Sequence, residues 1–411
     1  AETIIGGSTN DTVTLAAQAT GATIDLGACL DKLTLGAFVN TVTVSNVETI
    51  TGGATNDTVT LATRVTTAVI DLGAGNDTLT LGAFINTLTV SNVETLTGGV
   101  SSDTVVLGAA TSGAVIDLGA GNDSLTFADA GATVTVSNVE TITGGTADDV
   151  VSFGAQALSG IIDLGAGNDT VTLGAFVNTV TVSNAETITG GSTNDTVVFG
   201  AAVTGATIDL GTGNDTLVFA AGGATVTVSN IETITGSAAT DVVSLGNQAT
   251  GITIDLGGGS DALILRNQIN TVTVSNVETL TGGSSADTVT FGGAVTGATV
   301  DLGTGNDRLT LAAAGATVTV SNVETITGAG GTDVVTLATQ AVGTALDLGG
   351  GADALVLGNF LNTLTLSNVE TITGGSTDDI LTLGAQATGS TVDLGAGLDK
   401  LTLGAFVNTV T

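Results

Sequence analysis

The stretch VIDLGAGNDTLT, residues 69–80, contains the signals that decide the fold. Residues 69–72 and 78–80 alternate apolar with polar side chains, which is the period-two pattern of half-buried β-strands. The glycines, asparagine and aspartate between them are turn formers. The stretch therefore predicts two short strands joined by a tight turn.

This stretch recurs every 46 residues along the 411-residue chain. Its first aspartate occupies nine equally spaced positions: Asp25, Asp71, Asp117, Asp163, Asp209, Asp255, Asp301, Asp347 and Asp393. Spacing this strict is expected where each copy stacks in register on its neighbour. The sequence predicts an all-β parallel β-solenoid, a β-roll or β-helix of nine 46-residue repeats, in a single continuous array over residues 1–411. Because the chain begins and ends inside a repeat, we interpret it as a segment of a longer array.

Each copy contains two similar turns, which divide it into segments of 20 and 26 residues, as at Asp57, Asp77 and Asp103. We expect two coils per repeat, and one wide coil per repeat is the alternative. Asn92 has the same parity as Leu88 and Val90, so we also expect Asn92 and its counterparts to point inward.

Charge and composition restrict the possible partners and chemistry. The chain has 39 acidic residues against five basic ones, a net charge of −34. Nucleic acids and anionic membrane surfaces would repel it, and cations would bind it. No apolar run is long enough for membrane insertion. Cys29 is the only cysteine and histidine is absent, so a metal site would have to use oxygen ligands.

The acidic residues fall into columns that repeat from copy to copy, so a stack of copies places like charges next to one another. The glutamate column is interpreted as a solvated surface. Two columns of aspartates in glycine-rich turns are the candidate metal ligands, because such turns expose carbonyl oxygens beside a carboxylate. The candidate metal ligands are Asp11, Asp31, Asp57, Asp77, Asp103, Asp123, Asp149, Asp169, Asp195, Asp215, Asp241, Asp261, Asp287, Asp307, Asp333, Asp353 and Asp379.

These turns resemble the hemolysin-type, or repeats-in-toxin, nonapeptide G-G-x-G-x-D-x-U-x. The resemblance implies a β-roll with Ca²⁺ bound between successive turns. The motifs are degenerate: Leu72 stands where the first glycine of one turn belongs, and Thr55 replaces the third glycine of another. Asp399 is followed directly by Lys400, so we expect weak or absent metal binding there.

No unique cluster of titratable residues predicts catalysis, since each turn aspartate is one of many equivalents. We expect a structural, extracellular or cell-surface protein, a calcium-stabilised segment of a bacterial surface layer, fibre or giant adhesin. Its expected partners are calcium ions and other copies of itself, bound end to end or laterally. The alternative is an ice-binding solenoid, because Thr-x-Thr pairs such as Thr58/Thr60 and Thr78/Thr80 line the predicted strands.

Overall fold

The computed structural model describes residues 2–411; Ala1, the first residue of the predicted array, lies outside them. Within the described residues, every regular element is a β-strand and the recorded strand pairs are parallel. The prediction of an all-β parallel β-solenoid is confirmed. The chain divides into two compact units, residues 1–201 with 210–213 and residues 202–209 with 214–411. No helix in the described part of the chain has the length and apolar character needed to span a bilayer.

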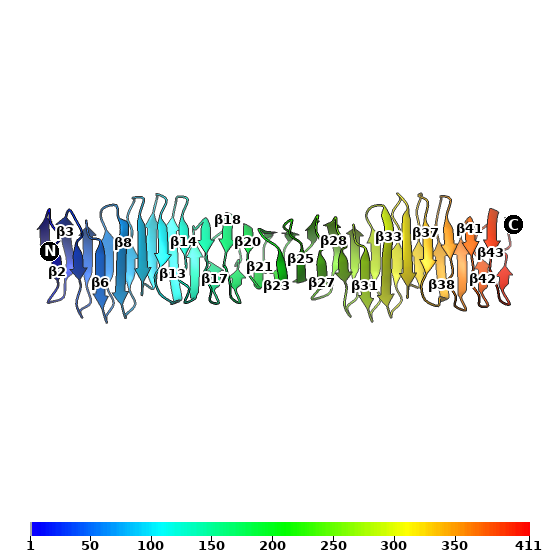
Figure 1. Ribbon diagram of the computed structural model, residues 1–411, viewed down its shortest axis with the longest axis horizontal. Coiled ribbons are helices and arrows are strands. Elements are labelled where there is room, and N and C mark those ends of the chain that lie inside the picture. Colours follow the sequence, from blue (N-terminus) through cyan, green and yellow to red (C-terminus); the bar gives the residue numbers. More distant parts are fainter. Residues whose placement is uncertain (1) are drawn as a thin grey trace. The chain divides into compact units, whose positions relative to one another are not determined.

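In the first unit, whose strands Figure 1 colours from blue to green, odd-numbered strands form one sheet and even-numbered strands form the other. The odd-numbered strands are β1 (Thr3–Gly7), β3 (Thr20–Gly27), β5 (Thr41–Ser45), β7 (Thr58–Leu61), β9 (Thr78–Thr80), β11 (Thr95–Gly99), β13 (Thr111–Gly119), β15 (Ala132–Ser137), β17 (Val150–Phe153), β19 (Thr170–Thr172) and β21 (Thr187–Gly191). The even-numbered strands are β2 (Thr12–Thr14), β4 (Lys32–Thr34), β6 (Thr49–Gly53), β8 (Thr66–Gly73), β10 (Thr87–Ser91), β12 (Thr104–Leu107), β14 (Ser124–Thr126), β16 (Thr141–Thr143), β18 (Leu158–Asp163), β20 (Thr179–Ser183) and β22 (Thr196–Phe199).

The second unit follows the same rule. Its odd-numbered strands are β23 (Val203–Gly211), β25 (Ala224–Ser229), β27 (Val242–Leu245), β29 (Ala262–Ile264), β31 (Thr279–Gly283), β33 (Val295–Gly303), β35 (Ala316–Ser321), β37 (Val334–Leu337), β39 (Ala354–Val356), β41 (Thr371–Thr373), β43 (Thr388–Asp393) and β45 (Thr409–Val410). Its even-numbered strands are β24 (Thr216–Val218), β26 (Thr233–Ser237), β28 (Thr250–Gly257), β30 (Thr271–Ser275), β32 (Thr288–Phe291), β34 (Arg308–Thr310), β36 (Thr325–Thr327), β38 (Val342–Asp347), β40 (Thr363–Ser367), β42 (Ile380–Leu383) and β44 (Lys400–Thr402).

Each coil contributes one strand to each sheet, and each 46-residue copy contains five strands. A copy is therefore two and a half coils, and the prediction of two coils per copy is wrong. Strands β7 and β8, between Asp57 and Asp77, make one coil. Strands β9, β10 and β11, between Asp77 and Asp103, make one and a half. Successive copies therefore start in opposite sheets, and the structural period is 92 residues.

Loops that lead from an odd to an even strand lie at one edge of the sheets, and loops that lead from an even to an odd strand lie at the other. We call these the odd-to-even edge and the even-to-odd edge. Because of the half coil in each copy, equivalent residues of neighbouring copies lie at opposite edges. This alternation applies within each unit.

The core of each coil lies between the two sheets, and alternate residues of each strand fill it. Ile70, Leu72, Leu79 and Leu81 are fully buried. Parallel pairing places apolar residues above one another, as in Leu79 beside Leu96. Burying such a side chain contributes about 1.5 to 3 kcal/mol, so every coil adds a comparable increment to stability.

The asparagine predicted to point inward instead marks a left-handed turn. Asn92 has φ +54°, and its exposed Nδ2 donates a 2.7 Å hydrogen bond to Asp71 Oδ1. Asparagine tolerates this left-handed conformation better than most residues. The prediction of an inward side chain is wrong, because the turn ends the strand alternation on which the prediction relied.

Candidate functional site

Buried acidic side chains form columns at the edges of the solenoid, and we call each column an acid ladder. One ladder contains Asn86 of the second copy and Asp103, Asp123 and Glu140 of the third. These residues come from successive coils at the odd-to-even edge. Asn86 N donates to Asp103 Oδ1 at 2.9 Å, and Asp103 N donates to Asp123 Oδ1 at 2.6 Å. Asp123 N donates to Glu140 Oε2 at 2.8 Å. Each carboxylate therefore ties its coil to the preceding one.

An equivalent ladder lies at the even-to-odd edge. It contains Asn40, Asp57, Asp77 and Glu94, joined by hydrogen bonds of 3.0, 2.6 and 2.7 Å. Where the asparagine is replaced by Ala132, the backbone N–H of Ala132 still donates to Asp149 Oδ1 at 2.7 Å. The ladder thus depends on backbone donors and carboxylate acceptors more than on the asparagine.

The predicted metal ligands all belong to these ladders or to their continuations. Asp11 is half-buried, and the other turn aspartates of the prediction are buried: Asp31, Asp57, Asp77, Asp103, Asp123, Asp149, Asp169, Asp195, Asp215, Asp241, Asp261, Asp287, Asp307, Asp333, Asp353 and Asp379. The two aspartate columns, separate in sequence, alternate within one ladder. Asp57 and Asp77, for example, come from adjacent coils and are hydrogen-bonded.

Sequence reasoning missed two members of each ladder. The glutamate column is not simply a solvated surface, because Glu94 and Glu140 are half-buried and accept backbone hydrogen bonds. The second missed member is the fully buried Asn86. Its Nδ2 donates to Phe84 O at 2.8 Å and to Asp103 Oδ1 at 3.0 Å. The spacing of 17, 20 and 17 residues between successive ladder members was the signal that could have identified both.

Burial makes these carboxylates hard to ionise. Desolvation by burial, with a smaller contribution from the charges of Glu94 and Asp57, raises the pKa of Asp77 to about 6. Burial likewise raises the pKa values of Asp123, Asp169 and Asp307 to about 6. Hydrogen bonds from the preceding coil oppose these shifts without cancelling them. At neutral pH the ladders therefore hold negative charge that a cation would stabilise.

One oxygen of many ladder aspartates is left over. Within the described residues, Oδ2 of Asp77, Asp123 and Asp169 is buried and has no hydrogen-bond donor. A buried carboxylate oxygen without a partner is costly, and either a proton or a cation relieves the cost. This leftover oxygen is the first indication that the ladders fit a metal ion.

The glycine turns supply further oxygens close to the carboxylates. At Gly167, where φ is +152°, an added Cβ would lie 2.8 Å from Ala147 O and 2.9 Å from Asp169 Oδ1. Glycine is needed there because both oxygens approach the α-carbon. Calcium takes six to eight oxygen ligands, including carboxylates and carbonyls. Residues 2–411 contain no group of three acidic or cysteine side chains that could hold a metal ion, so carbonyls would have to complete the coordination.

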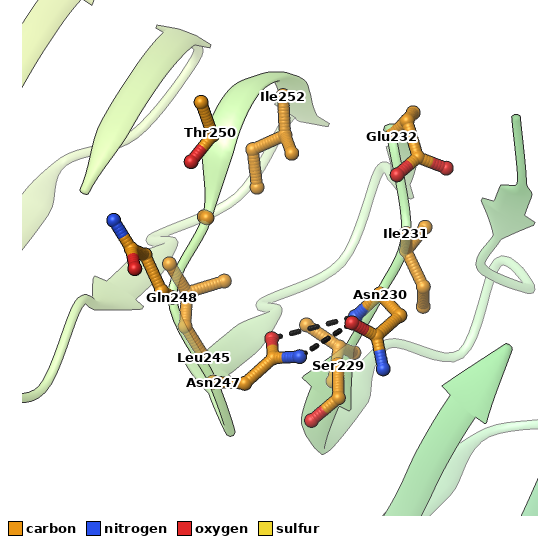
Figure 2. A pocket seen from close by; sticks show the side chains of 11 residues that line it. Ser229, Asn230, Ile231, Glu232, Leu245, Asn247, Gln248, Thr250 and Ile252 are labelled. Carbon is orange, nitrogen blue, oxygen red and sulfur yellow. Dashed lines mark hydrogen bonds between the residues drawn. The ribbon is translucent and has the colours of Figure 1, made fainter. Parts of the chain in front are cut away.

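A shallow polar recess of about 180 Å³ lies in the second unit. Figure 2 shows Asn230, Glu232, Asn247 and Gln248 around it. Asn247 Nδ2 donates to Asn230 Oδ1 at 2.5 Å. Similar recesses occur at the equivalent residues of other copies, such as those lined by Asn322 and by Asn368. The recess is therefore a property of the repeat rather than a unique cleft.

Comparison with known proteins agrees with this chemistry. The family model "RTX calcium-binding nonapeptide repeat (4 copies)" matches residues 69–88 and 161–180. These segments contain Asp77 and Asp169, two ladder aspartates with raised pKa values. No curated protein matches the chain at a significant level.

Among solved structures, the chain is similar to a hyperactive, Ca²⁺-dependent, β-helical antifreeze protein from an Antarctic bacterium. The sequences are 18% identical, the match covers 92% of this chain and 84% of the other, and the TM-score is 0.14. The RTX repeats imply Ca²⁺ as the bound ion, and Asp149 and Asp169, with carbonyl oxygens of their stacked turns, are residues that would hold it. Residues 69–88 and 161–180 thus match the RTX calcium-binding nonapeptide repeat, which is consistent with a calcium-binding repeat protein of the hemolysin type.

Proposed function

We propose that this chain is a structural, extracellular building segment, a calcium-stabilised solenoid of a bacterial surface layer, fibre or adhesin stalk. The observation that carries the proposal is the acid ladder, which recurs in successive copies and buries carboxylates such as Asp77 and Asp123, whose Oδ2 atoms have no hydrogen-bond donor within residues 2–411. A site that recurs in every repeat suits a structural role that is shared by all parts of the chain. It does not suit a single reaction, which would need one distinct cluster.

Extracellular calcium is the cation that fits this role. Each bound ion would neutralise ladder charge and supply a partner for a leftover aspartate oxygen. Because calcium binds the folded turns, its binding free energy adds to folding stability. We propose that the protein is exported, since RTX turns of this kind would gain stability only where calcium is plentiful.

Calcium removal tests this function. Chelation should lower the melting temperature measured by circular dichroism, and an elemental calcium count should give several ions per chain. Sodium chloride at equal ionic strength is the control. If calcium acted only by screening surface charge, sodium chloride would restore the melting temperature equally well. Unchanged melting in chelator, together with no protein-bound calcium, would refute the calcium-stabilised role.

Single-turn variants test the assignment of the ions to the ladders. Asp169→Ala, in a glycine-rich turn of a matched segment, should reduce the calcium count per chain. Asp399→Ala should leave the count nearly unchanged, because Lys400 follows it directly. Titration calorimetry of both variants measures the difference. Equal losses would show that the turns do not differ in the proposed way.

Ice binding is a second candidate, favoured by the register of the threonines. Two columns run through successive coils, the first through Thr20, Thr41, Thr58, Thr78 and Thr95 and the second through Thr3, Thr23, Thr43, Thr60, Thr80 and Thr97. The array ends at Val115 and Asp117. Because charged and apolar residues interrupt the columns, we rank this function second. Thermal hysteresis with faceted ice crystals would reverse the ranking.

A further inference from the structure

Equivalent loops at the two edges of the solenoid differ in the side chains they expose. At the odd-to-even edge of the first unit these loops occupy residues 81–86 and 173–178, and at the odd-to-even edge of the second unit they occupy residues 265–270 and 357–362. They present large apolar side chains to solvent, with exposed fractions of 38 to 58%: Phe84, Ile85, Phe176, Val177, Ile269, Phe360 and Leu361. We call these side chains the apolar knobs.

Loops of the even-to-odd edge expose mainly alanine and glycine. The exposed pairs are Asp129–Ala130, Ala221–Gly222 and Ala313–Ala314, and we call these loops the small-residue platforms. Around Ala313 the platform extends over stacked turns. Residues 292–294, 312–315 and 329–331 contain only alanine and glycine. The first and last copies differ, since their loops at this edge carry Phe38 and Phe406.

The fold does not require the knobs, because the platform loops also connect two strands and continue an acid ladder, and they do so without large apolar side chains. In a knob loop, Asn178 Nδ2 donates to Phe176 O at 2.7 Å, and Gln156 Nε2 donates to Val177 O at 2.6 Å. In a platform loop, Ala316 N donates directly to Asp333 Oδ1 at 2.8 Å. Both kinds of loop continue an acid ladder. The knob loops therefore use extra hydrogen bonds to hold apolar side chains in solvent, and recurrent exposed apolar groups mark interaction surfaces.

Knobs and platforms have the same period. Phe84 and Phe176 of the first unit are separated by 92 residues and five coils, as are Ala221 and Ala313 of the second. Five coils at the spacing of paired strands correspond to about 24 Å. A partner that matched successive knobs would need shallow recesses at this interval, and the platform edge of a second copy provides them. The ladders contain buried edge acids, and calcium bound there would neutralise part of their charge and reduce repulsion between two strongly acidic chains.

We propose that two copies of this chain associate side by side, with the apolar knobs of one on the small-residue platforms of the other. Different edges meet, so the contact is heterologous, and each added copy leaves a free knob edge and a free platform edge unless the rotation between copies closes a ring. The result is a lateral array. This inference rests on the proposed structural role and names the surfaces that serve it.

Complementary edge variants of the full chain in calcium test the proposal. The knob variant is Ile85→Ser, Val177→Ser, Ile269→Ser and Leu361→Ser, and the platform variant is Ala130→Gln, Ala221→Gln and Ala313→Gln. Light scattering coupled to size exclusion should give oligomers for the unaltered chain and monomers for each variant alone. An equimolar mixture of the two variants should give dimers and nothing larger, because each variant retains one functional edge.

The matched control substitutes apolar residues of similar exposure on the sheet faces: Val69→Ser, Val115→Ser and Ile161→Ser. It should assemble like the unaltered chain, and circular dichroism should give the same β content for every variant. If the unaltered chain assembles and the knob variant assembles equally well, the edge proposal is wrong while the structural role stands. A monomeric unaltered chain would overturn both lateral contact and self-assembly, and the chelation result would still decide the calcium role.

Discussion

At the scale of the residue, backbone strain identifies a position that can be improved. Thr67 has φ +66°, whereas most equivalent positions carry glycine, such as Gly113 at φ +79°. A β-branched residue is strained in this left-handed region. Thr67→Gly should therefore raise the stability by about 1 kcal/mol, measured as a higher melting temperature. Thr66→Gly is the control: Thr66 has no positive φ, so glycine there should lower the melting temperature.

A second residue, Asn86, tests how much the buried amide contributes. Asn86→Ala would leave Phe84 O and Leu81 O without their side-chain donor. We expect a loss of about 1 to 3 kcal/mol, the usual cost of unsatisfied buried polar groups. Denaturant titration measures it, and Asn92→Gly, which keeps the positive φ accessible at an exposed asparagine, should cost less. A larger loss for Asn92→Gly would show that the exposed turn, not the ladder, holds the loop.

At the scale of the element, the ladders predict a pH dependence that calcium should reverse. In chelator, Asp77, Asp123, Asp169 and Asp307 have folded-state pKa values of about 6 against an ordinary value of 3.8. A raised pKa means that the folded state binds protons more tightly than the unfolded state, so stability falls as pH rises from about 4 to about 6. The melting temperature in chelator should therefore increase on acidification from pH 7 to pH 5.

In calcium the sign should change, because a bound cation favours the ionised carboxylate and protons compete with it. Acidification should then lower the melting temperature. Asp123→Asn is the control for general charge repulsion, because it removes one ladder charge and retains the Oδ1 acceptor. In chelator, its melting temperature should depend less on pH than that of the unaltered chain. Identical pH profiles with and without calcium would contradict the assignment of calcium to the ladders.

Much of this architecture could be predicted from local sequence, and the errors have physical causes. Alternation within residues 69–80 and the 46-residue period were sufficient to predict the strands, the parallel solenoid and the position of aspartates in its turns. The coil count was not predictable from the turns alone, because the 26-residue segment contains three strands. The burial of Glu94 was missed because it depends on a hydrogen bond to Asp77, which stands 17 residues earlier and lies in the adjacent coil.

At the scale of the whole molecule, the half coil in each copy allows one repeated sequence to form two edges with different side chains. A copy of two or three whole coils would place every equivalent loop at the same edge. Two and a half coils place alternate copies at alternate edges, so substitutions confined to every second copy alter one edge alone. Phe84 and Phe176 occupy one edge in this way, while Ala130 occupies the other. Chemical asymmetry thus arises from an otherwise uniform repeat.

Deletions of whole copies test this relation between period and edge. Removing residues 93–138, one copy, keeps every turn in phase but shifts all later strands into the opposite sheet. The knobs Phe84 and Phe176 would then lie at opposite edges. Removing residues 93–184, two copies, leaves the edge of every later loop unchanged. Both shortened chains should fold with β content proportional to their length, because each coil contacts only its neighbours.

Assembly should distinguish the two deletions. The chain lacking two copies should form lateral oligomers in calcium, as the full chain is expected to do. The chain lacking one copy should remain folded but assemble poorly, because knobs that share an edge in the full chain no longer match the platforms of one neighbour. Circular dichroism measures the fold and light scattering the assembly. Equal assembly by both chains would show that the 92-residue period has no role in how copies meet, whereas loss of fold after the one-copy deletion alone would show that the alternation serves packing within the chain.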